Sequence, residues 1–259
     1  MANPVFNNTK QFQANASTPP VGFDLEPQPG IGVPQGADVM TYDGVLVKAA
    51  SFFMLAVAVA VAVGMFAPFE AIFPIAIAAF VMSLVSMFAA RKEPKPGLFA
   101  VTIGLYGGAA RGISRLYESQ WSGIILQALI ATAVVFAVSL AVYRSGRVRN
   151  MPKIRKFLAI AIPAYVVFSI INVAMVWTGG PDIRAMNIPG TSIPLGIILS
   201  LFAIALGAFM LISDFDFVDN GVRNGLPAKW EWTASYGLVF SIIWIYIEML
   251  RLLSYLRGR

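Results

Sequence analysis

The sequence has no histidine and no cysteine, and only 12% of its 259 residues are charged. Without cysteine, disulfides, thiolate metal sites, iron–sulfur clusters and cysteine nucleophiles are excluded. Without histidine, the usual general base, the usual transition-metal ligand and the usual switch near neutral pH are missing. Proton or cation binding must therefore depend on carboxylates, which favour protons and hard cations such as Ca²⁺. We expect no cofactor, and we treat calcium as a candidate for a transported ion.

Apolar residues make up 58% of the chain, whereas a soluble domain has roughly 45–50% apolar and about 25% charged residues. This composition predicts a protein that resides in a lipid bilayer. The formal net charge is +6, but the Lys and Arg residues fall mainly in short gaps between apolar runs. A nucleic-acid partner is therefore not expected.

Seven stretches are long and apolar enough to cross a membrane. A bilayer core of about 30 Å needs about 20 apolar residues in a helix, and only internally hydrogen-bonded helices cross it as separate segments. The stretches are Val45 to Phe66, Ala71 to Ala90, Leu98 to Leu116, Gly123 to Tyr143, Phe157 to Trp177, Ile193 to Ser213 and Trp232 to Leu256. We therefore predict an all-α, polytopic membrane protein. Residues 44–259 form a seven-helix bundle and residues 1–43, which are polar and rich in Asn, Gln, Pro and Gly, form a disordered cytoplasmic tail.

The basic residues predict the orientation, because Lys and Arg concentrate in short loops on the cytoplasmic side. They cluster after the second, fourth and sixth stretches. This places the N-terminus in the cytoplasm and the C-terminus outside the cell membrane. Arg251, Arg257 and Arg259 depart from the rule, so six crossings with one re-entrant segment is the alternative topology.

Glu248 lies well inside the last apolar stretch. An ionisable group there costs several kcal/mol unless it is paired or hydrated, so it is a candidate functional residue. One possible partner is Arg251, three residues further on the same helix face. The other is a second carboxylate from the end of the sixth stretch, where Asp214 and Asp216 follow the apolar run. A second carboxylate would raise the pKa of one member of the pair.

Arginines near the ends of two stretches are the other candidates. Arg91, at the inner end of the second stretch, either follows the charge rule alone or pairs with the acidic residues after the sixth. Arg111 lies inside the third stretch, with Arg115 and Glu118 on neighbouring turns. For these three we expect structural ion pairs that tie helices together.

Three motifs resemble the Bax inhibitor-1 family, also called TMBIM or YccA-like, in its variant with a long polar N-terminal tail. They are Gly112-Ile-Ser-Arg-Leu-Tyr-Glu, Ser213-Asp-Phe-Asp and Trp244-Ile-Tyr-Ile-Glu-Met-Leu-Arg-Leu-Leu. The resemblance covers the chain from about Val45 to its end. It implies a seven-helix bundle with the seventh helix central and a pH-sensitive calcium leak across the membrane.

The resemblance also implies roles for individual residues. A pair of acids on the sixth and seventh helices shares protons and senses pH, and an arginine after the second helix latches the closed pore. By motif, Asp214 is the acid of the sixth helix, with Asp216 as a competitor. Glu248 stands where the family has an aspartate, and Arg91 is the latch.

The position of the turn opposes direct contact between Asp214 and Glu248. Two residues of an antiparallel helix pair lie at one depth only if they are equally far from the turn, which would put the turn near Glu231. Asn224 and Pro227 instead predict an earlier turn. At about 1.5 Å per residue, this mismatch separates the carboxylates by more than about 10 Å.

The leading functional hypothesis is a pH-sensitive cation leak channel, with calcium as the ion and a carboxylate pair between the sixth and seventh helices as its gate. The first alternative is a non-conducting membrane stress regulator that binds a partner, such as a membrane protease, through its tail or loops. The second is a cation/proton exchanger. An enzyme is not expected, because no catalytic constellation is present in the sequence.

Overall fold

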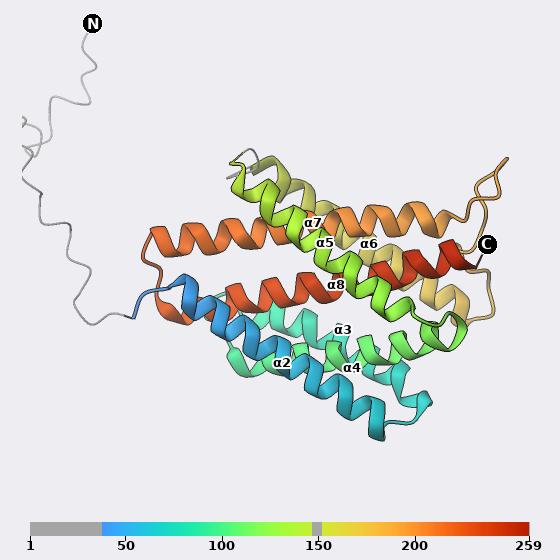
Figure 1. Ribbon diagram of the computed structural model, residues 1–259, viewed down its shortest axis with the longest axis horizontal. Coiled ribbons are helices and arrows are strands. Elements are labelled where there is room, and N and C mark those ends of the chain that lie inside the picture. The colour runs from blue at the N-terminus through green and yellow to red at the C-terminus, as the bar shows by residue number, and fades with distance from the viewer. Residues whose placement is uncertain (1–37, 147–151, 259) are drawn as a thin grey trace, which may run out of the picture. The chain divides into compact units, whose positions relative to one another are not determined.

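The fold is all-helical, as predicted, in the part of the chain that the structure describes (Figure 1). The computed structural model describes residues 38–146 and 152–258, and only the backbone of residues 152–155. The predicted tail lies outside the described residues as far as residue 37. The α-helices are α2 (Tyr42–Phe66), α3 (Ile72–Ala89), α4 (Pro96–Gln120), α5 (Ile124–Arg144), α6 (Pro152–Trp177), α7 (Leu195–Arg223) and α8 (Glu231–Arg257). Among the described residues, β-pairing is limited to two isolated bridges.

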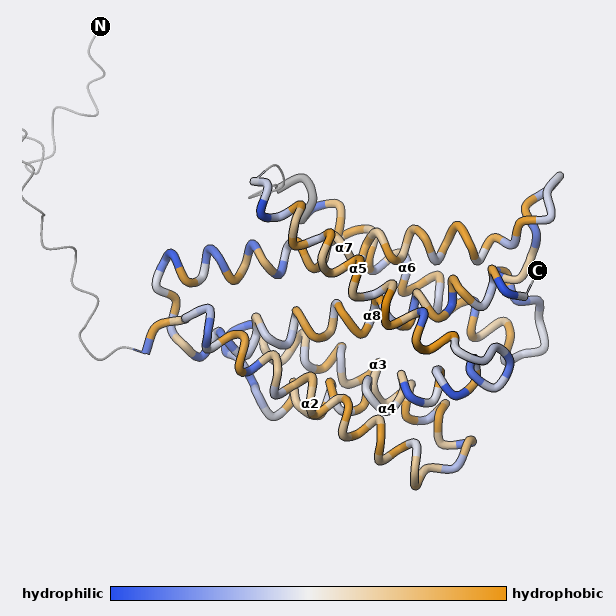
Figure 2. The backbone as a smooth tube through the Cα atoms, in the orientation of Figure 1, coloured by the Kyte–Doolittle hydropathy of each residue, from blue (hydrophilic) through white to orange (hydrophobic). Residues whose placement is uncertain are grey.

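Six of these seven helices are long and apolar enough to cross a membrane, and α4 is the exception. The seven predicted stretches coincide with the seven helices, and α4 is the stretch that contains Arg111 and Arg115. Figure 2 shows apolar residues along most of the helices, with polar residues gathered toward their ends. The described chain is therefore a polytopic membrane protein by the length and composition of its helices.

Helix α4 is covered by other helices. It packs against α2, α3 and α8, and it buries Phe99 and Ile103 together with a row of small residues. At Gly107 the two backbones come so close that a Cβ atom would clash with the backbone of Ala56 on α2. Small residues allow this close approach in membrane helices, which explains why the least apolar helix lies inside the bundle.

Helix α8 contacts two groups of helices. The first group is α2, α3 and α4, in which α4 packs on both others, and the second is α5, α6 and α7, in which α7 packs on both others. Helix α8 contacts α2 and α4 of the first group and α5 and α7 of the second, and Figure 1 shows it running between them. Val239 and Ile243 belong to the buried cluster on the first side, and Leu238 and Ile245 to that on the second.

The segment before α2 is attached to the turn between α7 and α8. The backbone N–H of Met40 donates to the carbonyl of Leu226 (2.7 Å), and that of Ala228 donates to the carbonyl of Asp38 (2.7 Å). Met40 is 1% exposed. Residues 38–41, which the sequence analysis assigned to the tail, are therefore part of the folded structure.

Replacement of Gly107 by valine is expected to destabilise the protein by about 1–3 kcal/mol, the usual cost of overpacking a close contact. Gly97→Ala is the control, because a Cβ at Gly97 meets nothing within 4 Å and alanine favours the helix. Thermal unfolding in detergent, followed by tryptophan fluorescence, measures the difference. Equal midpoints for the two variants would contradict the close packing of α2 and α4.

Candidate functional site

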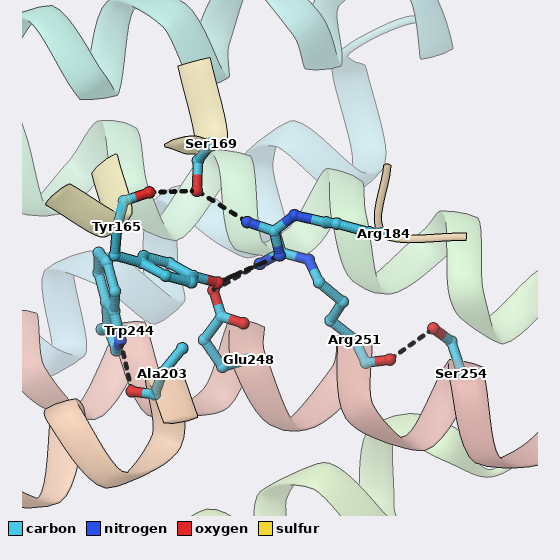
Figure 3. A network of polar contacts seen from close by, with 8 residues as sticks. All are labelled: Tyr165, Ser169, Arg184, Ala203, Trp244, Glu248, Arg251 and Ser254. Atoms are coloured by element: carbon cyan, nitrogen blue, oxygen red, sulfur yellow. Dashed lines mark hydrogen bonds and ion pairs between the residues drawn. The ribbon is translucent and has the colours of Figure 1, made fainter. Parts of the chain in front are cut away.

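Glu248 is a buried acidic residue inside the apolar run of α8, and it is 4% exposed. Its Oε1 accepts a hydrogen bond from the Tyr165 hydroxyl of α6 (2.9 Å) and one from the guanidinium of Arg251. Arg251 lies three residues further along α8, so the two side chains share one face. One of the two predicted partners of Glu248 is thus in contact with it, as Figure 3 shows.

Arg184, from the connection between α6 and α7, completes this cluster. Its guanidinium donates to the Tyr165 hydroxyl (3.1 Å) and to Ser169 Oγ (2.7 Å), and the residue is 6% exposed. Arg251 reaches the same tyrosine hydroxyl at 3.4 Å. One carboxylate and two guanidiniums therefore meet around a single phenol, which compensates charge that would otherwise be costly among apolar helices.

The loop that carries Arg184 is fixed by its own hydrogen bonds. Asp182 Oδ1 accepts from Asn172 Nδ2 and from the backbone N–H of Arg184, both at 2.9 Å. Asn172 Oδ1 accepts from the backbone N–H of Ile183 (2.9 Å). Sequence reasoning gave Arg184 no role. The feature of the sequence that could have indicated it is a single arginine between the fifth and sixth apolar stretches, in one of the loops that hold few basic residues.

A tryptophan extends the cluster to α7. The indole N–H of Trp244 on α8 donates to the carbonyl of Ala203 on α7 (3.1 Å), and its ring lies 5.6 Å from the Tyr165 ring. Figure 3 shows these groups together at one level of the bundle. The cluster therefore ties α8 to α6, to α7 and to the loop between them.

The second carboxylate oxygen of Glu248 has a different environment. Oε2 is buried and has no hydrogen-bond partner among the described residues. Glu248 lines a cavity of about 490 Å³ between α3, α6 and α8, whose walls include the apolar side chains of Phe73, Ile77 and Ile170. The oxygen is an acceptor at the edge of an apolar cavity, where a hydrogen-bond donor or a cation would satisfy it.

Asp214 lies on α7 at a different level from Glu248. Its Oδ2 accepts from the Ser241 hydroxyl of α8 (2.6 Å), and Gly237 leaves room beside its other oxygen. Ser241 precedes Glu248 by seven residues, which is about 10 Å along a helix. The turn at Asn224–Pro227 causes this difference in level, as the sequence predicted. It places Asp214 opposite Ser241 and not opposite Glu248. The structure thus gives the two acids separate partners in place of one shared hydrogen bond.

Asp216, the competing acid of α7, is 5% exposed, and its backbone carbonyl accepts from the side chain of Asn220 (2.8 Å). Two residues turn a helix by about 200°, so Asp214 and Asp216 point to different sides of α7. Asp214 is therefore the acid whose hydrogen bond reaches α8 at Ser241.

Arg91 lies just beyond the end of α3 and is exposed. Its guanidinium is 4.5 Å from the centre of the Phe88 ring, a cation–π contact on its own helix. Among the described residues, the structure pairs it with neither Asp214 nor Asp216. The predicted latch contact is not formed in this arrangement.

Glu118 was expected, like Arg111 and Arg115, to take part in structural ion pairs, and in the structure its hydrogen bonds go to the start of α5. Glu118 accepts hydrogen bonds from the backbone N–H groups of Gly123 (2.7 Å) and Ile125 (3.1 Å) at the start of α5. The first N–H groups of a helix have no partner within it, and a carboxylate is well placed to accept them. Arg115 is exposed. Glu118 therefore caps α5 and does not neutralise either arginine.

The apolar helices and the charged cluster inside the bundle define an integral membrane protein with several spans. The sequence matches the family described as Bax inhibitor 1 like over residues 3–258, and the chain belongs to that family. This confirms the resemblance inferred from the three motifs and extends it to residue 3. A comparison with curated proteins found no match.

Removal of the Tyr165 hydroxyl is expected to weaken the cluster, because the hydroxyl contacts Glu248 and both arginines. Tyr165→Phe should destabilise the protein by about 1–3 kcal/mol, the cost of leaving a buried charged partner without its hydrogen bond. Tyr106→Phe is the matched control, since that hydroxyl makes one long contact of 3.4 Å with Ser83. Unfolding midpoints in detergent that fall equally in both variants would contradict the role of the cluster.

Proposed function

We propose that this protein is a pH-sensitive cation leak pathway of the cell membrane, with calcium as the ion, and that it is not an enzyme. In this proposal all seven helices cross the bilayer and α8 is the central helix. Membership of the Bax inhibitor 1 like family supports a channel or regulator role. The observation that carries the proposal is that the acids Asp214 and Glu248 both connect α8 to the α5–α7 group from inside the bundle.

Asp214 is the proposed pH-sensing group. With a proton, its carboxyl is neutral and remains hydrogen-bonded to Ser241. Without the proton, a charge stands among apolar helices, and it attracts water and cations and favours separation of α7 from α8. Conduction is therefore expected to rise with pH.

Other charged and titratable groups at this end of the bundle lie on α2, α5, α7 and α8. Asp219 of α7 binds the hydroxyls of Tyr42 on α2 and Tyr143 on α5. Other groups there are Asp216 and Arg223 on α7, and Lys48 on α2 with its partner Glu231 on α8. Asp219 and Glu231 each pair with a basic residue, whereas Asp214 is hydrogen-bonded to the neutral Ser241, so we assign the pH response to Asp214.

Glu248 has a separate role in this proposal. The gate is not a proton shared between the two acids, since each has its own partners about 10 Å apart along α8. Glu248 Oε2 offers an oxygen ligand of the kind that calcium prefers, and Arg251 holds the other oxygen. The Glu248 cluster is therefore the proposed second site for the ion along the pathway, after the gate at Asp214.

Calcium flux into proteoliposomes tests the proposal. Wild-type flux should rise with pH, and Asp214→Asn should flatten that dependence by removing the titrating group. Asp43→Asn is the control, because Asp43 is an exposed acid in the first turn of α2. A wild-type flux that ignores pH, or an Asp214→Asn profile that matches wild type, would contradict the proposed gate. Flux coupled strictly to an opposing proton gradient would identify an exchanger.

A non-conducting regulator is the second candidate, and one observation favours it. Residues 38–40 pair with the α7–α8 turn at Leu226 and Ala228, so a protein bound to the preceding tail would act on these helices. Deletion of residues 1–37 separates the candidates, because a leak pathway keeps its calcium flux without them. A chain that lacks flux but captures a membrane protease through the tail would favour the regulator.

A further inference from the structure

Arg111 is a cationic side chain without a charged partner in the described part of the chain. Glu118, the acid nearest to it in the sequence, caps α5. Arg111 lines a cavity of about 440 Å³ between α2, α4, α5 and α8. Its guanidinium lies against Gly64 of α2, where a Cβ atom would clash with it. Gly64 therefore makes room for the arginine beside the cavity.

The walls of this cavity have no acid to offer. They are apolar except for Arg111 and the hydroxyls of Ser114, Thr132 and Tyr246. Ser114 donates its hydroxyl hydrogen to the carbonyl of Ala110 (2.6 Å), so Tyr246 must be the donor in the contact between their hydroxyls (2.7 Å). Thr132 donates to a backbone carbonyl of its own helix. Arg111 is thus the group in this wall with N–H donors available for an anion.

The cavity continues into a space that is mostly apolar and becomes polar at its far end, where Tyr143, Arg144 and Asp219 line it. A neighbouring cavity of about 790 Å³ shares Phe53, Phe136 and Ile242 with it and extends along α2 and α5 toward Tyr42. The side chains along its edge are half exposed, with Phe53 at 46% and Leu129 at 50%. In a bilayer these faces of α2 and α5 meet lipid. The space between the two helices, which we call the α2–α5 groove, therefore suits an alkyl chain.

We propose that the α2–α5 groove binds a long-chain carboxylate, a fatty acid, with its carboxylate on Arg111 and its chain between α2 and α5. A planar guanidinium binds a carboxylate through two parallel hydrogen bonds. One uncompensated cation matches one negative charge, and an unpaired arginine among apolar walls is otherwise costly. The apolar lining around Arg111 has no further donors for the larger, more polar headgroup of a phospholipid.

The experiment uses the full chain in phosphatidylcholine vesicles with a photoreactive diazirine fatty acid. After irradiation, mass spectrometry locates the labelled peptides. Labels are expected on α2 and α5, and unlabelled fatty acid should displace the probe. Arg111→Gln should lower labelling about tenfold, the factor that follows from loss of a charge-assisted hydrogen bond. A diazirine alcohol with the same chain should label weakly.

Filling each cavity in turn supplies the matched controls. Ala133→Phe puts a ring into the α2–α5 groove and should abolish labelling there, whereas Ala76→Phe fills the cavity beside Glu248 and should leave it unchanged. If Arg111→Gln does not fold, as judged by its unfolding midpoint, Ala133→Phe decides the question.

Three results would overturn the assignment. The first is equal labelling of wild type and both groove variants. The second is equal labelling by the acid and the alcohol. The third is stronger labelling of the groove by a diazirine phosphatidic acid, which would assign it to a lipid phosphate. None of these depends on calcium flux, so the two proposals fail or stand separately.

Discussion

The structure depends on one constraint, that a charged side chain inside a bilayer must find its partners on other parts of the protein. Glu248 meets this requirement through Arg251 on its own helix and Tyr165 on α6, and Arg184 joins from the following loop. Because these partners come from different elements, the last helix is joined to the α6–α7 part of the bundle by polar contacts. Apolar packing and further hydrogen bonds, such as those of Ser235, Ser241 and Tyr246, supply other contacts of α8. Polar contacts and apolar packing together therefore determine the position of α8.

Two groups of helices that share α8 leave a space on each side of it. One is the α2–α5 groove, which contains Arg111, and the other is the cavity between α3, α6 and α8, which contains Glu248. Each space is thus lined by an ionisable group with unused hydrogen-bonding capacity, Arg111 in one and Glu248, beside Arg251, in the other. Lipid would be expected to fill both spaces unless a ligand or ion competes for them. Under the proposed function, a movement of α8 would change both spaces and so connect the proposed leak pathway with the lipid-facing surface.

The sequence was sufficient to predict the helices, because each stretch is long enough to span a bilayer and is bounded by polar residues, although α4 does not reach the apolar character of the other six. Helical spacing offered Arg251 as one of two possible partners of Glu248, and the level of Asp214 followed from the turn residues. Arg184 was missed because its partners lie on helices distant in sequence, and periodicity within one helix carries no such information. Glu118 was assigned to ion pairs because the N–H groups of the next helix that donate to it come within reach only through the tight turn, and the conformation of that turn is not evident from the sequence.

Pulsed electron paramagnetic resonance tests the central claim, that ionisation of Asp214 separates α7 from α8. The chain has no cysteine, so spin labels at Ile198 and Leu256, both exposed, would be the sole thiol-linked groups. These positions lie at the ends of α7 and α8 that are remote from the connecting turn. A separation of the two helices is largest there. The distance between the labels in vesicles should lengthen as pH rises and should stay constant in the Asp214→Asn background. A wild-type distance that does not change with pH would contradict the account.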